Sequence, residues 1–199
     1  TLALALERAL RARGLVVRLT REPGGTPLAE RLRGLVLERG NESIDPAAET
    51  LLMFAARAIH LDNLVRPALS AGTWVICDRF TDATFAYQGA GRGVQAALIE
   101  RLAAGVHADL WPQRTLLLDL PVADGMARAR ARRGQGDRFE DEQREFFERV
   151  RSAYLRIAAA EPQRVRVLDA GVDAAALAVD ALAALSDLLP PQVGAVDAV

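Results

Sequence analysis

Two short motifs in the sequence place charged side chains directly after apolar segments. "TREPGGT" begins at Thr20, and "DRFTDATFAYQG" begins at Asp78. A carboxylate at the end of a strand can position Mg²⁺ beside phosphates, so we expect Asp78 to lie near a metal. The guanidinium of Arg79 can hold a phosphate through two hydrogen bonds. The pattern indicates a phosphate site. The alternative for Asp78 and Arg79 is a pair that only links loops. The alternative for "TREPGGT" is a surface turn with a solvated ion pair.

A second group of side chains has the properties of a nucleobase site. Thr84, Tyr87 and Gln88 have the spacing of one face of a short helical turn, and Gln88 carries both a donor and an acceptor. Phe54 and Arg57 are three residues apart in "LLMFAARAIH" and share a helix face, where a ring can stack on a base. Taken alone, the motif is better explained as a core aromatic beside a surface arginine. The glycines at positions 89, 91 and 93 suggest a flexible loop or a turn.

The segment "ARARARRGQGDRFE", from Ala127 to Glu140, concentrates positive charge before two glycines. Arginines delivered by a closing lid would stabilise charge on a transferring phosphoryl group. A solvated helix face is the simpler reading, and a nucleic-acid patch is disfavoured because interleaved aromatics are absent. The arginines concerned are Arg128, Arg130, Arg132 and Arg133.

Strand and helix patterns alternate along the whole chain. Strands are expected at 15–20, 73–78, 114–120 and 164–170, of which 73–78 and 114–120 read as fully buried. Helices are expected before, between and after them, including 27–40 and the long stretch from residue 47 to residue 69. The alternation predicts an open parallel α/β sheet, with its binding crevice at the carboxyl ends of the strands. We expect one domain over 1–189 and a frayed tail over 190–199.

Composition excludes several other classes of protein. Of the 199 residues, 51% are hydrophobic and 26% are charged, as in soluble globular proteins. The net charge of −1 gives no reason to expect a nucleic acid or a membrane as partner. Cys77 reads as core packing in a reducing cytoplasm. His60 and His107 have no metal-ligand spacing around them, so both read as structural and no zinc site is indicated.

The four motifs, in this order, resemble those of the bacterial thymidylate kinase family, from Thr1 to about Leu188. The resemblance implies transfer of the ATP γ-phosphate to dTMP with Mg²⁺, and a cytoplasmic homodimer. It implies the P-loop nucleoside monophosphate kinase fold, a three-layer open parallel sheet with helices on both faces. A kinase for another nucleotide or a deoxynucleoside is the nearest alternative, and a non-catalytic nucleotide-binding module is the other.

The resemblance also implies roles for individual residues. Arg79 would grip the dTMP phosphate with help from Arg33, and Glu22 would lie near the acceptor. Phe54 would stack on thymine, Arg57 would reach its O4 edge, Thr84 and Gln88 would face the base, and Tyr87 would lie under the deoxyribose. The lid over ATP would consist of Arg128, Arg130, Arg132 and Arg133, with Arg130 and Arg132 catalytic beside Asp78 and Arg79. Asp78 and Glu140 would serve the metal, Asp137 would lie near the sugar or metal, and Thr1 and Asp169 would lie along ATP.

The chain departs from the family pattern at two places. Many relatives carry the stacking aromatic four residues before the arginine, where this chain has Met53, so Met53 and Phe54 are both candidates. All 25 basic residues are arginine, and the phosphate loop G-x-x-x-x-G-K-[ST] is not found in the 199 residues. We expect the first strand and this loop, roughly 15–20 residues, to precede Thr1. Residues 1–199 alone are expected to be inactive.

Overall fold

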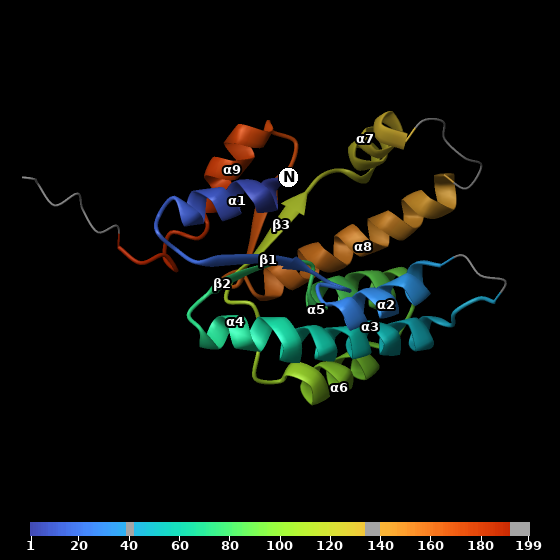
Figure 1. Ribbon diagram of the computed structural model, residues 1–199. Coiled ribbons are helices and arrows are strands. Elements are labelled where there is room, and N and C mark those ends of the chain that lie inside the picture. The colour runs from blue at the N-terminus through green and yellow to red at the C-terminus, as the bar shows by residue number, and fades with distance from the viewer. Residues whose placement is uncertain (39–41, 134–139, 192–199) are drawn as a thin grey trace, which may run out of the picture.

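Two parallel strand pairs form the centre of the protein (Figure 1), in a computed structural model that describes residues 1–38, 42–133 and 140–191. The strands are β1 (Val17–Arg21), β2 (Trp74–Asp78), β3 (Thr115–Asp119) and β4 (Val165–Asp169). β1 pairs with β2, and β3 pairs with β4. The registers place Arg21 beside Asp78 and Asp119 beside Asp169, so charged residues meet at the carboxyl ends. All four predicted strands are confirmed.

Helices fill the intervals between the strands, and local sequence explains where several of them begin. Pro27 and Pro46 each occupy the first turn of a helix, where a missing N–H is tolerated. Asp45 accepts hydrogen bonds from the backbone N–H groups of Ala47 and Ala48. The helices are α1 (Leu2–Arg11), α2 (Pro27–Leu37), α3 (Pro46–His60), α4 (Arg66–Ser70), α5 (Thr81–Thr84), α6 (Ala96–His107), α7 (Val122–Arg133), α8 (Glu140–Ala160) and α9 (Ala174–Ala183), with π-helical segments η1 (Leu61–Val65) and η2 (Phe85–Gly91). None of the helices in the described part of the chain is long and apolar enough to cross a membrane.

One apolar cluster joins the two strand pairs on the side covered by α1 and α9 (Figure 1). Its buried members are Leu6, Leu168, Ala181 and Leu185. Ile76 of β2 and Leu116 of β3 pack against this same cluster, so both pairs share one hydrophobic layer. Within the described ranges, hydrogen bonds join β1 to β2 and β3 to β4, but none joins β2 to β3.

The expectation of two fully buried strands is wrong. Trp74 to Cys77 of β2 are only partly buried, and Leu118 of β3 is 44% exposed. Both strands are apolar along their length, but β2 and β3 have no hydrogen-bonded neighbour on one side among the residues that the structure describes. Their apolar side chains are therefore less covered than the sequence pattern predicts.

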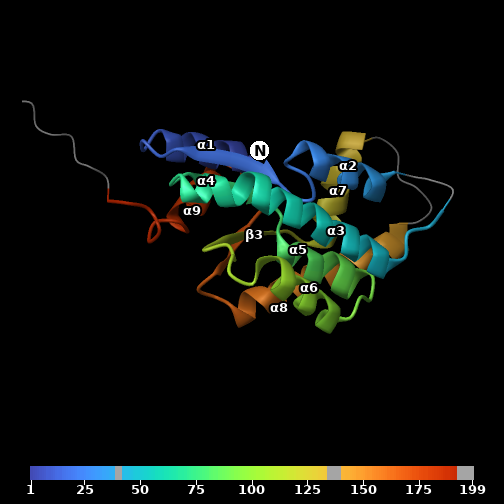
Figure 2. The same cartoon turned by 60° about the horizontal axis from the view of Figure 1, so that its bottom comes forward.

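On the other side of the strands, α3, α6, η2 and α8 form the second helical layer (Figure 2). Ala86 of η2 is buried against Val150 and Ala153 of α8. A Cβ atom on Gly91 would lie 2.5 Å from the Phe146 ring, so α8 approaches η2 closely at this glycine. The expected loop is therefore wrong at Gly89 and Gly91, which lie in a helical segment packed against α8, whereas the expected helical turn around Tyr87 and Gln88 is confirmed.

Candidate functional site

The carboxyl end of β2 presents a cation to solvent. Arg79 has a positive φ of 73°, a strained conformation for a residue other than glycine. Its guanidinium lies 4.6 Å from the centre of the Tyr87 ring, and Nη2 donates to the Tyr87 hydroxyl at 3.3 Å. Asp78 beside it is exposed, and its backbone carbonyl accepts from the N–H of Glu22 at 2.9 Å. The exposed guanidinium is thus braced by the tyrosine and remains accessible to an anion.

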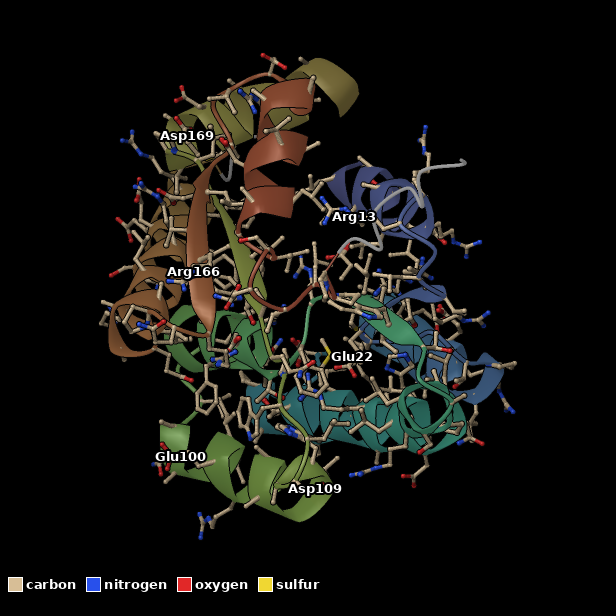
Figure 3. The ribbon with its side chains drawn as sticks, turned by 90° about the vertical axis from the view of Figure 1, so that its left-hand side faces the viewer. Arg13, Glu22, Glu100, Asp109, Arg166 and Asp169 are labelled. Atoms are coloured by element: carbon tan, nitrogen blue, oxygen red, sulfur yellow. The ribbon has the colours of Figure 1, made fainter. Side chains whose placement is uncertain are left out.

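A buried ion pair lies behind this end of the strand, and Figure 3 shows Glu22 near the centre of the molecule. Arg57 Nε donates to Glu22 Oε2 at 2.6 Å, and Arg57 Nη2 donates to the Thr84 hydroxyl at 3.1 Å. Both charged side chains are at most 4% exposed. Arg57 Nη1 has no hydrogen-bond partner among the described residues, although it is buried. A buried unpaired donor costs free energy, which makes Nη1 a candidate contact for a ligand oxygen.

His60 completes the environment of Glu22. Its Nδ1 lies 3.0 Å from Glu22 Oε1, and its Nε2 lies 2.8 Å from the Thr20 hydroxyl. An ionised carboxylate only accepts, so Nδ1 carries the hydrogen in this contact. Both oxygens of Glu22 are therefore occupied, one by His60 and one by Arg57.

Potential ligand atoms of Glu22, His60 and Cys77 lie within 4.8 Å of one another, a grouping that the sequence did not indicate. The carboxylate and the imidazole already use their polar atoms in hydrogen bonds. Burial raises the pKa of the Cys77 thiol, which opposes the thiolate form that binds metals. These three side chains are therefore better explained as a hydrogen-bond network than as a metal site.

A second buried carboxylate faces η2. Glu49 of α3 is 5% exposed, and its Oε1 accepts from Gln88 Nε2 at 2.8 Å. Its Oε2 lies 3.2 Å from Arg92 Nη1. Glu49, Met53 and Arg57 are spaced four residues apart, so they follow one ridge of α3. Thr84 and Gln88 face this ridge from α5 and η2 through their contacts with Arg57 and Glu49.

Phe54 lies in the core rather than on this ridge. It is 2% exposed and packs with Ile99 and Ala103 of α6. The Arg57 guanidinium lies 4.7 Å from the centre of its ring and covers it. Met53 is partly buried on the ridge between Glu49 and Arg57. Of the two candidates for stacking on a base, the geometry favours Met53.

The remaining predicted acceptor residues lie around the same strand end. Arg33 Nη1 donates to the carbonyl of Pro23 at 2.9 Å, which holds α2 against the loop after β1. Tyr87 packs edge-on against Phe146 and Tyr154 of α8. Burial raises the pKa of the Tyr154 hydroxyl, which therefore stays neutral beside Tyr87. Tyr87 is thus held between α8 and Arg79.

Two of the predicted ATP residues, Arg128 and Asp169, lie together at the carboxyl ends of β3 and β4. Arg128 of α7 donates to the carbonyl of Ala170 at 2.8 Å, next to Asp169, which Figure 3 shows near α7. Asp169 Oδ1 accepts from the N–H of Gly171 at 2.6 Å. Thr1 is exposed at the start of α1. Four further predicted residues have side chains outside the described part of the structure: Arg130, Arg132, Arg133 and Glu140. Residue 137 lies wholly outside it.

Thr20, Glu49 and His60 join the hydrogen bonds around the predicted acceptor residues Glu22 and Gln88 without having been predicted there. Glu49 could have been found from its spacing, because it lies four residues before Met53 and eight before Arg57 on one helix. No comparable signal identified His60, because its partners come from β1 and from the loop that follows it.

Comparisons with known proteins agree on one family. The profile of the family described as thymidylate kinase matches residues 1–177. A thymidylate kinase of Ectopseudomonas mendocina (strain ymp) is 54% identical over 184 residues, covering 92% of this chain and 87% of the relative. One of Pseudomonas fluorescens (strain SBW25) is 55% identical over 179 residues, covering 89% and 85%. A crystal structure of thymidylate kinase from Ehrlichia chaffeensis matches with a TM-score of 0.71 and 32% identity, covering 92% of this chain and 87% of that one.

Proposed function

Because the chain belongs to the thymidylate kinase family, we propose that it binds dTMP between the carboxyl end of β2 and the facing sides of α3 and η2. The reaction is the transfer of the ATP γ-phosphate to dTMP, giving dTDP. The observation that carries the proposed site is the buried Arg57 Nη1, which has no hydrogen-bond partner among the described residues and lies behind the exposed Arg79. One arginine has a free donor for a base oxygen, and the other offers its charge to a phosphate.

The base would lie along the ridge of α3. Arg57 Nη1 would donate to O4 of thymine, and Thr84 and Gln88 would lie along the other side of the base. Met53 would pack against the face of the base. Tyr87 would lie under the deoxyribose, which is consistent with its contact to Arg79. The contacts Arg57–Thr84 and Glu49–Gln88 join the two sides of the proposed site.

The phosphate of dTMP would be held by Arg79, with Arg33 nearby on α2. Asp78 offers an exposed carboxylate at the same strand end, and hard oxygen ligands suit Mg²⁺. We therefore place the magnesium ion or its water ligands beside Asp78, with Glu140 as the second candidate. When bound, Mg²⁺ would neutralise charge on the phosphates.

ATP would approach from the ends of β3 and β4. Arg128 and Asp169 already lie beside each other there, and Arg130, Arg132 and Arg133 follow on the same helix. The phosphate loop expected before Thr1 would follow a strand placed between β2 and β3. This placement is supported by the apolar layer that β2 and β3 share without hydrogen bonds between them. A sequence upstream of Thr1 without a glycine-rich G-K-S/T loop would contradict it.

We also propose a homodimer that forms through the outer face of α2. Leu28 and Leu35 are seven residues apart on one face of this helix and are 50% and 52% exposed. A self-complementary apolar stripe suits a twofold contact between two copies. Replacing both leucines with Glu should give a monomer in sedimentation experiments, whereas a wild-type monomer would contradict the proposal.

We place the enzyme in the cytoplasm, where its nucleotide substrates are found.

The decisive experiment is a coupled assay of the full-length protein with ATP, Mg²⁺ and a series of nucleoside monophosphates. We expect dTMP to be preferred. Replacing Arg79 with Ala should raise the KM for dTMP by about tenfold to a hundredfold, because a charge-assisted hydrogen-bonded contact contributes about 1.5–3 kcal/mol. The matched control is Arg13→Ala, a change at an exposed arginine in the turn after α1. An unchanged KM would show that Arg79 does not hold the phosphate.

The lid residues require a different readout. Replacing Arg130 and Arg132 with Ala should lower kcat by orders of magnitude and leave dTMP binding nearly unchanged, because the lid would act on the transferring phosphoryl group. Weaker dTMP binding with an unchanged kcat would show that this assignment is wrong.

A further inference from the structure

We propose that Glu49 is a positioning residue that determines base specificity through Gln88. Its carboxylate sets which end of the Gln88 amide faces the nucleobase, so that the site accepts a thymine edge and rejects a cytosine edge. This inference rests on the proposed dTMP site, and it adds a residue that contacts no substrate atom itself.

The contact between the two side chains leaves the amide no choice of orientation. Gln88 Nε2 lies 2.8 Å from Glu49 Oε1, and both side chains are about 5% exposed. An ionised carboxylate can only accept hydrogen bonds, so the NH₂ group of the amide must face it. Arg92 Nη1 lies 3.2 Å from the other carboxylate oxygen, so both oxygens of Glu49 face donors. The amide oxygen of Gln88 is therefore directed away from Glu49.

Arg57 is the second reading group, and its hydrogen-bonding capacity is fixed as well. A guanidinium can only donate, and Arg57 Nη1 is the donor left without a partner in the described part of the chain. Arg57 contacts Thr84, which precedes Gln88 by four residues. Thr84 and Gln88 both contact the ridge of α3, so the two reading groups face the same side of the proposed site. Glu22 holds the Arg57 donor in place, and Glu49 holds the Gln88 acceptor in place.

This pair of groups matches thymine and opposes cytosine. Thymine carries an acceptor at position 4 and an N–H donor at position 3, whereas cytosine carries an amino donor at position 4 and an acceptor at position 3. A fixed donor on Arg57 and a fixed acceptor on Gln88 pair with the first arrangement and leave buried groups unpaired with the second. Unpaired buried polar groups are the strongest basis for rejecting a close analogue.

The change Glu49→Gln tests the idea with almost no change of shape. A glutamine at position 49 can accept or donate, so the Gln88 amide becomes free to turn and to offer its NH₂ group to the base. The full-length enzyme would be assayed with dTMP and with 5-methyl-dCMP, which differ only at the reading edge. We expect the ratio of kcat/KM for dTMP over 5-methyl-dCMP to fall at least about tenfold, which corresponds to about 1.4 kcal/mol.

The control is Glu7→Gln, which removes the same charge from an exposed pair with Arg11 on α1 and should leave the ratio unchanged. An equal loss for both nucleotides in Glu49→Gln would indicate a structural role alone and would overturn the inference. In a Gln88→Leu background, Glu49→Gln should have no further effect on the ratio, and a full effect there would also overturn it. If Glu49→Gln does not fold, Gln88→Leu alone must lower the ratio. A wild-type enzyme that does not prefer dTMP would instead refute the proposed function.

Discussion

Replacing Glu22 with Gln is the most direct test of how the acceptor site is held together. Glu22 is the only acidic partner of Arg57 within the described ranges, and the two side chains are 3% and 4% exposed. Removing one partner of a buried ion pair leaves a buried charge and costs about 3–5 kcal/mol. In a domain of this size, each kcal/mol lowers Tm by about 2–4 °C, so we expect a fall of about 6–20 °C.

The loss would be measured by thermal and urea unfolding of the full-length protein at pH 7. The matched control is Glu30→Gln, which breaks an exposed pair with Arg21 and should cost less than about 1 kcal/mol. The double variant Glu22→Met, Arg57→Met should be more stable than Glu22→Gln, because it leaves no unpaired charge. A Glu22→Gln variant within about 1 kcal/mol of wild type would refute the buried-pair reasoning.

Two further predictions concern packing and pH. Gly91→Ala should destabilise the protein by about 1–3 kcal/mol in urea unfolding, because its Cβ would overlap the Phe146 ring. The control is Gly34→Ala in α2, where an added Cβ would meet no atom within 4 Å, and it should stabilise the protein by about 0.5–1 kcal/mol. Equal effects of the two changes would refute the contact between Gly91 and Phe146. The Arg151 side chain lowers the pKa of Asp119, so this pair stabilises the fold above the unfolded pKa of about 3.9 and loses its contribution as pH falls through the lowered pKa. Asp119→Asn should therefore cost up to about 1 kcal/mol at pH 7 and nothing in strong acid, and a cost independent of pH would contradict this.

The order of elements and the location of the chemistry could be predicted from local sequence. β-branched and apolar runs predict the four strands, and each ends within one or two residues of its predicted limit. A parallel sheet collects its strand ends at one edge, so Asp78 and Asp169 were expected there, and Asp119 ends β3 at the same edge. Strand ends that collect at one edge lie beside one another. The register, which places Arg21 beside Asp78 and Asp169 beside Asp119, comes from the structure.

Contacts between distant segments could not be predicted in this way. The glycines at 89 and 91 suggested a loop, but packing against Phe146 makes the small residue necessary within a helix. The three-residue spacing of Phe54 and Arg57 was consistent with stacking on a base, yet α6 covers Phe54. Helix periodicity defines which residues share a face, but not which neighbour that face meets.

By itself, therefore, the sequence determined the alternating α/β pattern, the charged strand ends and the family. It did so because turn residues, apolar runs and short motifs act over a few residues. Only the tertiary structure decided that Arg57 is paired with Glu22 and contacts Thr84, and that Glu49 orients Gln88. Those contacts join residues 27 to 39 positions apart, and their strength comes from burial, which no single segment can provide.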